Sequence, residues 1–555
     1  MLTDLEIAQA NEMQPIEAIA GKLGLNPNTL EHFGKYKAKI DINAIGAETF
    51  TKDAQVILVT AITPTPAGEG KSTTTIGLGD ALNRLGHLTT VCIREPSLGP
   101  VMGIKGGAAG GGFSQVVPME DINLHFTGDI HAITTANNLI SAVIDNHLFQ
   151  GNDLHIDKDR IIWKRAMDMN DRSLRKIEVG LSSKKETPRT DGFDITVASE
   201  VMAALCLSRD LDELKLRTSR MVVAYDLAGK PVTVADLRCQ GAVAMLLRDA
   251  IKPNLVQTLE HNPVLIHGGP FANIAHGCNS VIATDLACRL SEFVVTEAGF
   301  GADLGMEKFM DIKSRVLGRK PAVVVLVASI RALKLHGGAL KEQLASEDLT
   351  ALAKGIANLA KHVENVGHFR LPFVIALNRF PSDTEAELEH LLSWARSNHH
   401  PIALSEVFAK GSLGGVELAE TVLQLAKLHQ EKMAEPLYPL ALPLKAKMET
   451  IAKKLYGARA VIFTELAEEQ LQKATAFGWD NLPVCMAKTP LSLSDNPKLL
   501  GRPAAFEITI REIKPSIGAG FIVALTGEVM TMPGLPKKGA YENMDVVANK
   551  ITGLF

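Results

Sequence analysis

The sequence predicts an α/β protein built around a large, mainly parallel sheet. Apolar segments rich in β-branched residues recur along the chain, and many are followed by a glycine-containing loop and a segment with helical spacing. Strands that alternate with helices in this way favour a parallel sheet covered by helices. The predicted strands are 55–62, 88–93, 263–266, 293–296, 322–327, 373–377 and 401–404, and the predicted helices are 72–85, 129–147, 194–216, 241–248, 281–290, 340–366 and 416–429.

Three regions depart from this pattern. Residues 1–50 mix short amphipathic segments with turn signals and are expected to form a helical lead-in. The basic segment 157–189 is predicted to be an outlying subdomain or exposed connection with a solvated basic face. A proline-rich stretch at 435–444 marks a boundary before a smaller C-terminal region with short strands. We therefore expect three domains, at 1–360, 361–440 and 441–555.

Composition excludes several classes of protein. With 46% hydrophobic and 22% charged residues, the chain is globular, and no apolar run reaches the roughly 18 residues of a membrane helix. A net charge of -4 and 5% aromatic residues give no electrostatic footprint for nucleic acid. Six cysteines without a CxxC pair indicate neither a zinc site nor a disulfide framework, and we expect them to be buried. Because no signal-peptide pattern is present, we expect a cytoplasmic protein that binds small molecules, with no nucleic-acid or membrane partner.

Residues 63–74, TPTPAGEGKSTT, form the motif on which the functional prediction depends. A glycine-rich loop that ends in Lys-Ser, between a buried strand and a helix, is typical of phosphate binding, because its backbone amides and the helix N-terminus attract a polyphosphate. Lys71 would contribute a mobile cation and Ser72 would face Mg²⁺. Thr65 stands where the general pattern has its first glycine, so an ordinary glycine-rich turn is the alternative interpretation.

This motif predicts that the large sheet belongs to a P-loop NTPase-like domain, with smaller α/β domains on its C-terminal side. No HExxH zinc motif and no GxSxG nucleophile motif competes with this interpretation. The candidate ATP-binding residues are Thr65, Pro66, Ala67, Gly68, Glu69, Gly70, Lys71, Ser72 and Thr73.

Charged residues follow two other predicted strands. Arg94 and Glu95 come directly after strand 88–93, and ligands of open α/β sheets bind outside the carboxyl ends of the strands. Arg94 could therefore hold an acid or phosphoryl group in a two-pronged manner beside Lys71, although a surface ion pair is the alternative. Glu297 ends strand 293–296 before a glycine-rich loop, where nucleotide-binding folds often have a carboxylate for water or Mg²⁺; we do not include it in the predicted site.

Three further features were interpreted by position. The segment 103–113, GIKGGAAGGGF, is expected to be a loop that approaches a ligand closely, with a disordered linker as the alternative. Asp129 lies near the start of helix 129–147, where it could simply cap the helix. Asn378, after strand 373–377, resembles the base-recognition corner of nucleotide-binding proteins.

These residues carry a resemblance to one family. The stretches TPTPAGEGKSTT, REPSLGP, GIKGGAAGGGF, HGGPFANIAHGCNS, TEAGFGADLG, VASIRALKLHGG, LNRF and MTMPGLPKK resemble the formate–tetrahydrofolate ligase (formyltetrahydrofolate synthetase) family over nearly the whole chain. The resemblance implies ATP-dependent ligation of formate to tetrahydrofolate, giving 10-formyltetrahydrofolate, ADP and phosphate through formyl phosphate. It also implies a homotetramer activated by a monovalent cation, K⁺ or NH₄⁺, and a monofunctional form, since no dehydrogenase or cyclohydrolase region is attached.

The resemblance also assigns roles to individual residues. Lys71 matches the phosphate-loop lysine, and Arg94 matches the arginine that holds formyl phosphate. Glu95 and Asp129 fall at the monovalent-cation site. Phe380 of LNRF and Phe408 of SEVFAKG match the aromatic pair that sandwiches the pterin, in the second domain. Two departures are visible, because position 408 is Trp in some members and Ser329 stands where Thr is common; the smaller ring at Phe408 puts folate affinity in question.

Other functions remain open from sequence. A switch or partitioning ATPase has the same kind of loop, but it would depend on a protein partner. A different carboxylate-activating ligase is the nearer alternative. Both aromatic residues could also be core residues, since large apolar side chains are commonly buried. ADP release that depends on both formate and tetrahydrofolate separates the three functions.

Overall fold

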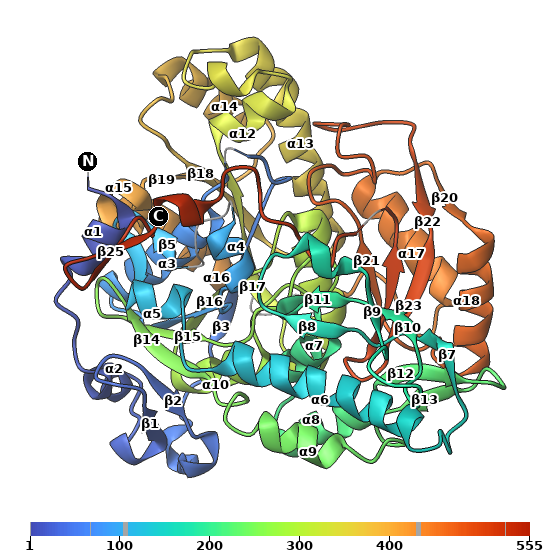
Figure 1. Cartoon of the computed structure of the whole chain (residues 1–555). Coiled ribbons are helices and arrows are strands. Elements are labelled where there is room, and N and C mark those ends of the chain that lie inside the picture. Colours follow the sequence, from blue (N-terminus) through green and yellow to red (C-terminus); the bar gives the residue numbers. More distant parts are fainter. Residues whose placement is uncertain (1, 67, 104–108, 429–433, 528, 555) are drawn as a thin grey trace.

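A twelve-stranded sheet runs through the centre of this computed structural model, and seven neighbouring strands in it are parallel (Figure 1). The structure describes residues 2–66, 68–103, 109–428, 434–527 and 529–554. In sheet order the parallel strands are β15 (Pro263–Ile266), β4 (Thr89–Ile93), β16 (Phe293–Glu297), β3 (Gln55–Ala61), β17 (Pro321–Ala328), β18 (Phe373–Asn378) and β19 (Ile402–Ser405). The predicted α/β class with a large parallel sheet is confirmed.

Antiparallel strands extend one side of the sheet. β14 (Asn254–Thr258) pairs with β15, and β2 (Ala38–Ile40) joins β14 to β1 (Leu30–His32). The prediction of a helical lead-in over residues 1–50 was therefore wrong for 30–40, which contain two strands. The α-helices in the described part of this lead-in are α1 (Asp4–Gln9) and α2 (Ile16–Lys22). The hairpin of β5 (Gly110–Gly111) and β6 (Ser114–Val117) also pairs with β14, so the glycine-rich segment is partly strand; its residues 104–108 lie outside the described part.

β14 has no counterpart among the predicted strands because its polar side chains are buried. Thr258 donates a hydrogen bond to Asp80 Oδ1 at 2.6 Å, and the Asn254 amide donates to Asp129 Oδ2 at 2.8 Å. These partners satisfy the buried polar groups of the strand. A strand of this kind lacks the apolar signal from which strands are recognised.

The order of the central strands brings their carboxyl ends together. β16 lies between β3 and β4, although the chain reaches it last of the three. All three strands run in the same direction, so the residues that follow them meet at one edge of the sheet. This edge holds the phosphate loop, Arg94 and Glu297.

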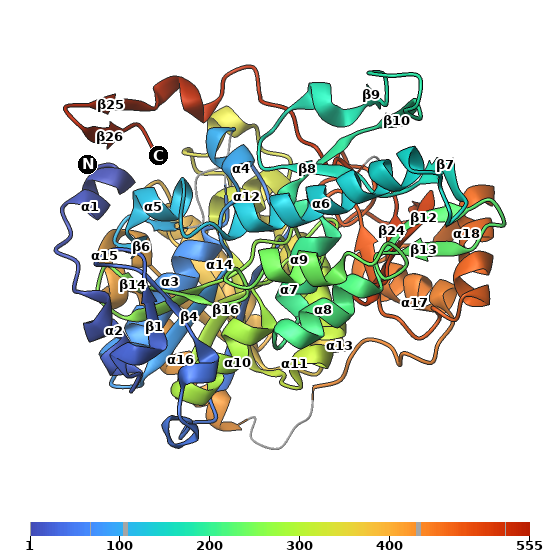
Figure 2. The same cartoon turned by 60° about the horizontal axis from the view of Figure 1, so that its bottom comes forward.

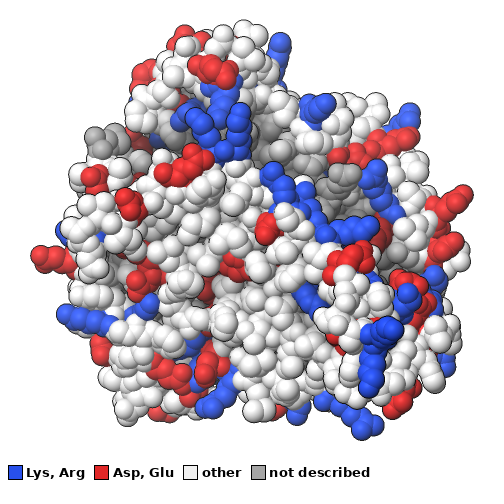
Figure 3. Space-filling model, in the orientation of Figure 1, with Lys and Arg blue, Asp and Glu red and all other residues white. Residues whose placement is uncertain are grey.

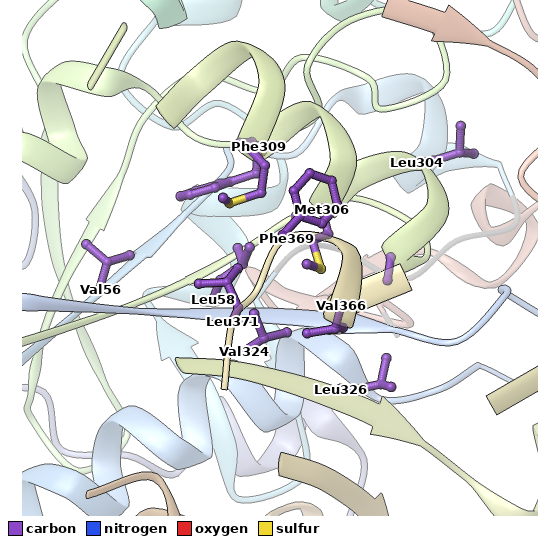
Figure 4. Packing of buried hydrophobic residues seen from close by; sticks show 14 of the residues in the cluster. Val56, Leu58, Leu304, Met306, Phe309, Val324, Leu326, Val366, Phe369 and Leu371 are labelled. Atoms are coloured by element: carbon purple, nitrogen blue, oxygen red, sulfur yellow. The ribbon is translucent and has the colours of Figure 1, made fainter. Parts of the chain in front are cut away.

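Alternate residues of the strands pack on opposite faces of the sheet. On one face, Ile57 and Val59 pack against α3 (Lys71–Arg84) and α16 (Val416–Leu428). On the other face, Val56 and Leu58 belong to a larger cluster that also contains residues of α13 (Leu349–His368) (Figure 4). Side chains of a strand point alternately to its two faces, and here both faces are apolar because helices cover both.

Two predicted helices differ in extent from the observed ones. The segment 340–366 begins as an α-helix only at Leu349, where the Asp348 side chain accepts a hydrogen bond from the Ala351 N–H at 2.8 Å. The segment 194–216 divides into β11 (Phe193–Ile195), α7 (Glu200–Leu207) and α8 (Leu211–Ser219). Ser199 and Asp210 cap the two helices, so each starts anew.

The remaining helices cover the sheet and its flanks. They are α4 (Leu98–Met102), α5 (Met119–Asn123), α6 (Asp129–Phe149), α9 (Gln240–Leu246), α10 (Val281–Leu290), α11 (Ser314–Leu317), α12 (Ile330–His336), α14 (Glu385–Ser397), α15 (Val407–Lys410), α17 (Leu444–Ile451) and α18 (Glu465–Ala476). No helix in the described ranges is both long enough and apolar enough to cross a membrane.

The C-terminal region has small sheets of its own. β20 (Ala460–Phe463) pairs with β22 (Glu507–Ile510), and β24 (Phe521–Leu525) lies between β21 (Val484–Ala487) and β23 (Glu512–Ser516). Their inward residues, such as Met486 and Ile522, share one hydrophobic cluster with the central sheet. The tail then returns to the N-terminus, where β25 (Asp545–Val547) and β26 (Lys550–Thr552) lie beside α1 (Figures 1 and 2).

The basic segment forms short strands beside this C-terminal region. These are β7 (Ile156–Ile161), β8 (Arg165–Met167), β9 (Ile177–Val179) and β10 (Arg189–Asp191), with β12 (Val222–Asp226) and β13 (Pro231–Thr233) pairing alongside β7. The predicted solvated face is wrong in part, because the buried Arg189 pairs with Asp145 at 2.7 Å and Asp191 at 3.2 Å.

Several predictions from composition can be compared with the fold. All six cysteines are buried and free, as expected. Charged residues of both signs are spread over the face shown in Figure 3, which fits the small net charge. A cavity of about 760 Å³ lies between the basic segment and the C-terminal region, and none of the predicted site residues lines it.

Candidate active site

The predicted phosphate loop, residues 63–74, connects β3 to α3, and it is held from β18, which is separated from β3 in the sheet by β17. Asn378, at the end of β18, donates a hydrogen bond of 3.0 Å from its amide to the backbone oxygen of Glu69. A side chain at Gly70 would meet this amide, because a Cβ there would lie 2.1 Å from Asn378 Nδ2, and Gly70 has a φ of +79°. Glycine is therefore required at this position. The predicted loop residue Ala67 lies outside the described residues.

The start of the loop is anchored by three residues of α12 and α13. Asn358 donates to the Thr63 hydroxyl at 2.9 Å, and this hydroxyl lies 2.9 Å from His362 Nε2. Burial lowers the pKa of His362 to about 4, so its ring is neutral. His336 donates from Nε2 to the Thr63 carbonyl oxygen at 2.8 Å. No local motif identified these anchoring residues, because they act on the loop from a distant part of the chain.

Glu69 closes the loop on itself. Both the backbone N–H and the hydroxyl of Thr65 donate to Glu69 Oε1, at 2.7 Å and 3.0 Å. Burial raises the pKa of Glu69 to about 7, against the opposing effect of these hydrogen bonds. Thr65 therefore has a defined structural role at the position where a first glycine was expected.

Glu297 lies at the junction between the loop and Arg94. The Ser72 hydroxyl donates to Glu297 Oε2 at 2.9 Å, and Arg94 Nη2 lies 3.7 Å from Glu297 Oε1. Lys71, one residue before Ser72, donates to the backbone oxygen of Phe300 at 3.4 Å. The structure thus brings together the predicted Lys71, Ser72 and Arg94, and adds Glu297, which the sequence analysis left out of the site. The sequence signal that could have identified Glu297 as a site residue was its position at the end of a predicted strand.

Arg94 is held by the loop that follows β15. Its Nη1 donates to the carbonyl oxygen of Pro270 at 3.1 Å, and its Nε is buried with no hydrogen-bond partner among the described residues. A Cβ at position 299 would lie 3.2 Å from Nη1, so glycine leaves room for the guanidinium group. The predicted alternative of a surface ion pair does not fit, because the partner Glu297 is buried.

The two residues predicted to hold a monovalent cation are both buried. Asp129 is the first residue of α6 and pairs with Lys39 Nζ at 2.6 Å. Glu95 has one carboxylate oxygen, Oε2, without a hydrogen-bond partner among the described residues. Burial, followed by the negative charge of Asp129, raises the pKa of Glu95 well above its usual range. The orphaned oxygen next to a second carboxylate fits a cation, and no group of three potential metal-ligating side chains occurs in the described ranges.

Phe380 and Phe408 follow the neighbouring strands β18 and β19. Asn378 and Ser405, the last residues of these strands, are register partners, so both aromatic residues lie at the same edge of the sheet. Phe408 is 44% exposed, and the alternative that it belongs to the core is therefore wrong. Phe380 is half-buried, with the Arg331 guanidinium 5.0 Å from its ring centre.

The glycine-rich segment approaches Phe408. The Phe113 N–H donates to the Phe408 carbonyl oxygen at 2.8 Å, and a Cβ at Gly112 would lie 2.1 Å from that oxygen. The described end of segment 103–113 therefore packs closely against the backbone of a predicted folate-binding residue; the close approach to a ligand stays a prediction.

A family model described as formate–tetrahydrofolate ligase matches residues 2–555. The match covers the phosphate loop, the strand ends that carry Arg94 and Glu297, and the aromatic residues after β18 and β19. Formate–tetrahydrofolate ligases are ATP-dependent ligases of one-carbon metabolism. The chain belongs to the formate–tetrahydrofolate ligase family.

Proposed function

We propose that this protein ligates formate to tetrahydrofolate through a formyl phosphate intermediate. The observation that carries the proposal is the contact of Glu297 with both Ser72 and Arg94, since it joins the loop that would hold ATP to the arginine that would hold the activated acid. Formate is a poor electrophile, so an oxygen of formate first attacks the γ-phosphorus of ATP and ADP leaves. The amine nitrogen of tetrahydrofolate then attacks the formyl carbon, phosphate leaves with the C–O bonding electrons, and the nitrogen loses a proton.

The phosphate loop would position ATP for the first step. Phosphoryl transfer needs charge neutralisation and in-line positioning more than covalent help. The backbone amides of residues 68–73 and the N-terminus of α3 would hold the phosphates, and Lys71 would move from the Phe300 carbonyl oxygen to the γ-phosphate. Ser72 and Glu297 fit a bound Mg²⁺, because a hydroxyl and a carboxylate already converge there; the ion would supply charge neutralisation at the phosphates.

Arg94 would hold formyl phosphate for the second step. A guanidinium group can contact two oxygens of a phosphate, and the Nε of Arg94 has no hydrogen-bond partner among the described residues. Phe380 and Phe408 would hold the pterin ring between them at the same sheet edge. Exclusion of water from this site would protect the anhydride from hydrolysis.

The family resemblance supports a cation site and a homotetramer, and the sequence pattern supports a location and a domain division. Glu95 and Asp129 would hold K⁺ or NH₄⁺, consistent with the orphaned oxygen of Glu95. The protein would form a homotetramer in the cytoplasm. The chain would divide into an ATP-binding domain at 1–360, a folate-contributing domain at 361–440 and a smaller domain at 441–555.

One isotope experiment tests the proposed chemistry. Turnover with ¹⁸O-labelled formate, ATP and tetrahydrofolate should place one label in inorganic phosphate, because the attacking formate oxygen stays on phosphorus when the formyl carbon is transferred. Label in AMP would indicate an acyl-adenylate and a different carboxylate-activating ligase. Release of ADP that requires neither formate nor tetrahydrofolate would instead favour a switch ATPase.

A further inference from the structure

An internal ammonium group already pairs with one of the two proposed cation ligands. Lys39 lies on β2 with 1% of its surface exposed, and its Nζ lies 2.6 Å from Asp129 Oδ1. The second oxygen of Asp129 accepts a hydrogen bond of 2.8 Å from Asn254. Lys39 and Asn254 are register partners on β2 and β14. Two paired strands therefore hold both oxygens of Asp129.

Glu95 is bonded differently. Its backbone N–H donates to the Gly268 carbonyl oxygen at 2.8 Å, which fixes the main chain, but its carboxylate Oε2 has no partner in the described residues. With 5% of the residue exposed, bulk water does not satisfy this oxygen. The pair thus combines one fully bonded carboxylate with one that has a vacant acceptor.

Few other charges act on this pair. Asp168 is the weaker acidic neighbour of Glu95, and its oxygens accept hydrogen bonds from the Ser97 hydroxyl at 2.5 Å and the Leu98 N–H at 2.9 Å. His267 is neutral, since burial lowers its pKa to about 4. Lys39 is therefore the cation that balances Glu95 and Asp129.

We propose that Lys39 restricts the Glu95–Asp129 site to a single monovalent cation. With an ion bound, both carboxylates are ionised and carry two negative charges. The fixed ammonium group cancels one of them, which leaves one positive charge for the ion to supply. A divalent ion would bring excess charge and would be repelled by the ammonium group, an interaction that a buried site screens poorly. The inference rests on the proposed cation site, and it names the residue that sets the charge of the ion accepted there.

The wild type, two single variants and their double variant are compared, so that effects of the charge of the site can be separated from effects on its structure. The carboxylate pair and Lys39 together have a net charge of -1 in the wild type, -2 in Lys39→Met, zero in Asp129→Asn and -1 again in the double variant. Methionine preserves much of the length of lysine, and the double variant leaves neither residue with a buried unpaired charge. Lys37→Met is the control, because Lys37 pairs with Asp121 at 2.7 Å, outside the site.

The melting temperature of each nucleotide-free protein is measured against KCl and against CaCl₂, with tetramethylammonium chloride holding ionic strength constant. We expect K⁺ to stabilise the wild type, the Lys37→Met control and the double variant. Ca²⁺ should stabilise Lys39→Met with a half-saturating concentration at least about tenfold below that of the wild type, since one opposing charge is gone. Asp129→Asn should respond to neither ion.

The outcomes distinguish this inference from the proposed function. A wild type that responds to K⁺, together with a Lys39→Met variant that keeps the same K⁺ and Ca²⁺ responses, would overturn the role of Lys39 alone. A wild type that does not respond to K⁺ would overturn the proposed cation site and this inference with it. If Lys39→Met does not fold, the double variant decides: a K⁺ response absent in Asp129→Asn and regained in the double variant supports the proposal, and its continued absence overturns it.

Discussion

The hydroxyl of Ser72 donates a hydrogen bond of 2.9 Å to Glu297, a residue 225 positions further along the chain. Ser72 lies in the first turn of α3 and Glu297 ends β16, so the contact crosses from the phosphate loop to the neighbouring strand. The same carboxylate lies 3.7 Å from Arg94. Glu297 therefore contacts two groups that the proposed reaction uses in successive steps.

Glu297→Gln should lower kcat by about 10²- to 10³-fold, or about 2.7–4 kcal/mol of transition-state stabilisation, because the amide cannot supply the negative charge that balances Arg94 and Mg²⁺. The Mg²⁺ concentration for half-maximal activity should also rise. Steady-state kinetics over a Mg²⁺ titration measures both. Glu292→Gln, which changes a half-exposed residue just before β16, should behave as the wild type. Unchanged Mg²⁺ dependence in Glu297→Gln would argue against its role.

Lys71→Ala should abolish formylation while the melting temperature stays near that of the wild type. Lysine at this position would contribute charge at the γ-phosphate and little packing, so we expect a loss of at least about 10³-fold in kcat. Activity and thermal denaturation of the same preparation are compared. Lys453→Ala, which removes an exposed pair with Glu449, is the control for a lost surface charge. Activity close to that of the wild type would disprove the phosphate-loop interpretation.

Arg94→Lys should retain ATP binding and lose turnover. An ammonium group cannot reproduce the planar fork of a guanidinium, and we expect kcat to fall at least about 100-fold while the Kd for ATP stays within about threefold of the wild type. Calorimetry measures ATP binding, and rapid quench measures a single turnover. Weakened ATP binding with normal single-turnover chemistry would place Arg94 at the nucleotide instead.

Phe408→Ala should raise the KM for tetrahydrofolate by about tenfold, because a stacked ring loses its apolar area and ring contact. The KM for ATP and the stability should change little, since 44% of Phe408 is exposed. Phe309→Ala is the matched control, because Phe309 is fully buried and its truncation should cost about 3–5 kcal/mol of stability. Both KM values and denaturant unfolding are measured. Parallel losses in both substrates and in stability would contradict a binding role for Phe408.

Asp80→Asn should change how stability depends on pH. Burial raises the pKa of Asp80 in α3 to about 7, so the folded protein holds its proton more tightly than the unfolded chain does. Its contribution to stability is therefore greatest below about pH 4 and is lost as the pH rises toward 7, by an amount of about 4 kcal/mol. The amide keeps an acceptor for Thr258 and Asn262 and does not titrate. Unfolding curves from pH 4 to 8 should show the variant gaining relative to the wild type; parallel curves would refute this.

The sheet was predictable where its strands are apolar. β3, β4 and β17 are rich in β-branched residues, and the structure places them close to their expected bounds. β14 was not predictable because its polar side chains are buried against Asp80 and Asp129, partners more than a hundred residues away in the chain. Local pattern carries no information about such partners.

The residues of the candidate site divide in the same way, into those that a local sequence pattern predicts and those that it does not. Lys71 and Arg94 follow strands in recognisable motifs, and both lie at the shared sheet edge. Lys39 and Asn358 could not be assigned, since a lysine in a lysine-rich segment and an asparagine within a helix both suggest solvent exposure, yet each is buried against a site residue. Their roles depend on three-dimensional contacts between elements distant in sequence.

The position of β16 between β3 and β4 has a consequence for synthesis on the ribosome. β3 and β4 are complete early, but they are not neighbours in the sheet, and the strand that joins them is made roughly 200 residues later. At about 5–20 residues per second the nascent chain must wait roughly 10–40 s for this strand. Until β15 is made and pairs with β4, and β16 then joins β4 to β3, these apolar strands have no native partner, so the nascent chain exposes unpaired edges and is a substrate for chaperones.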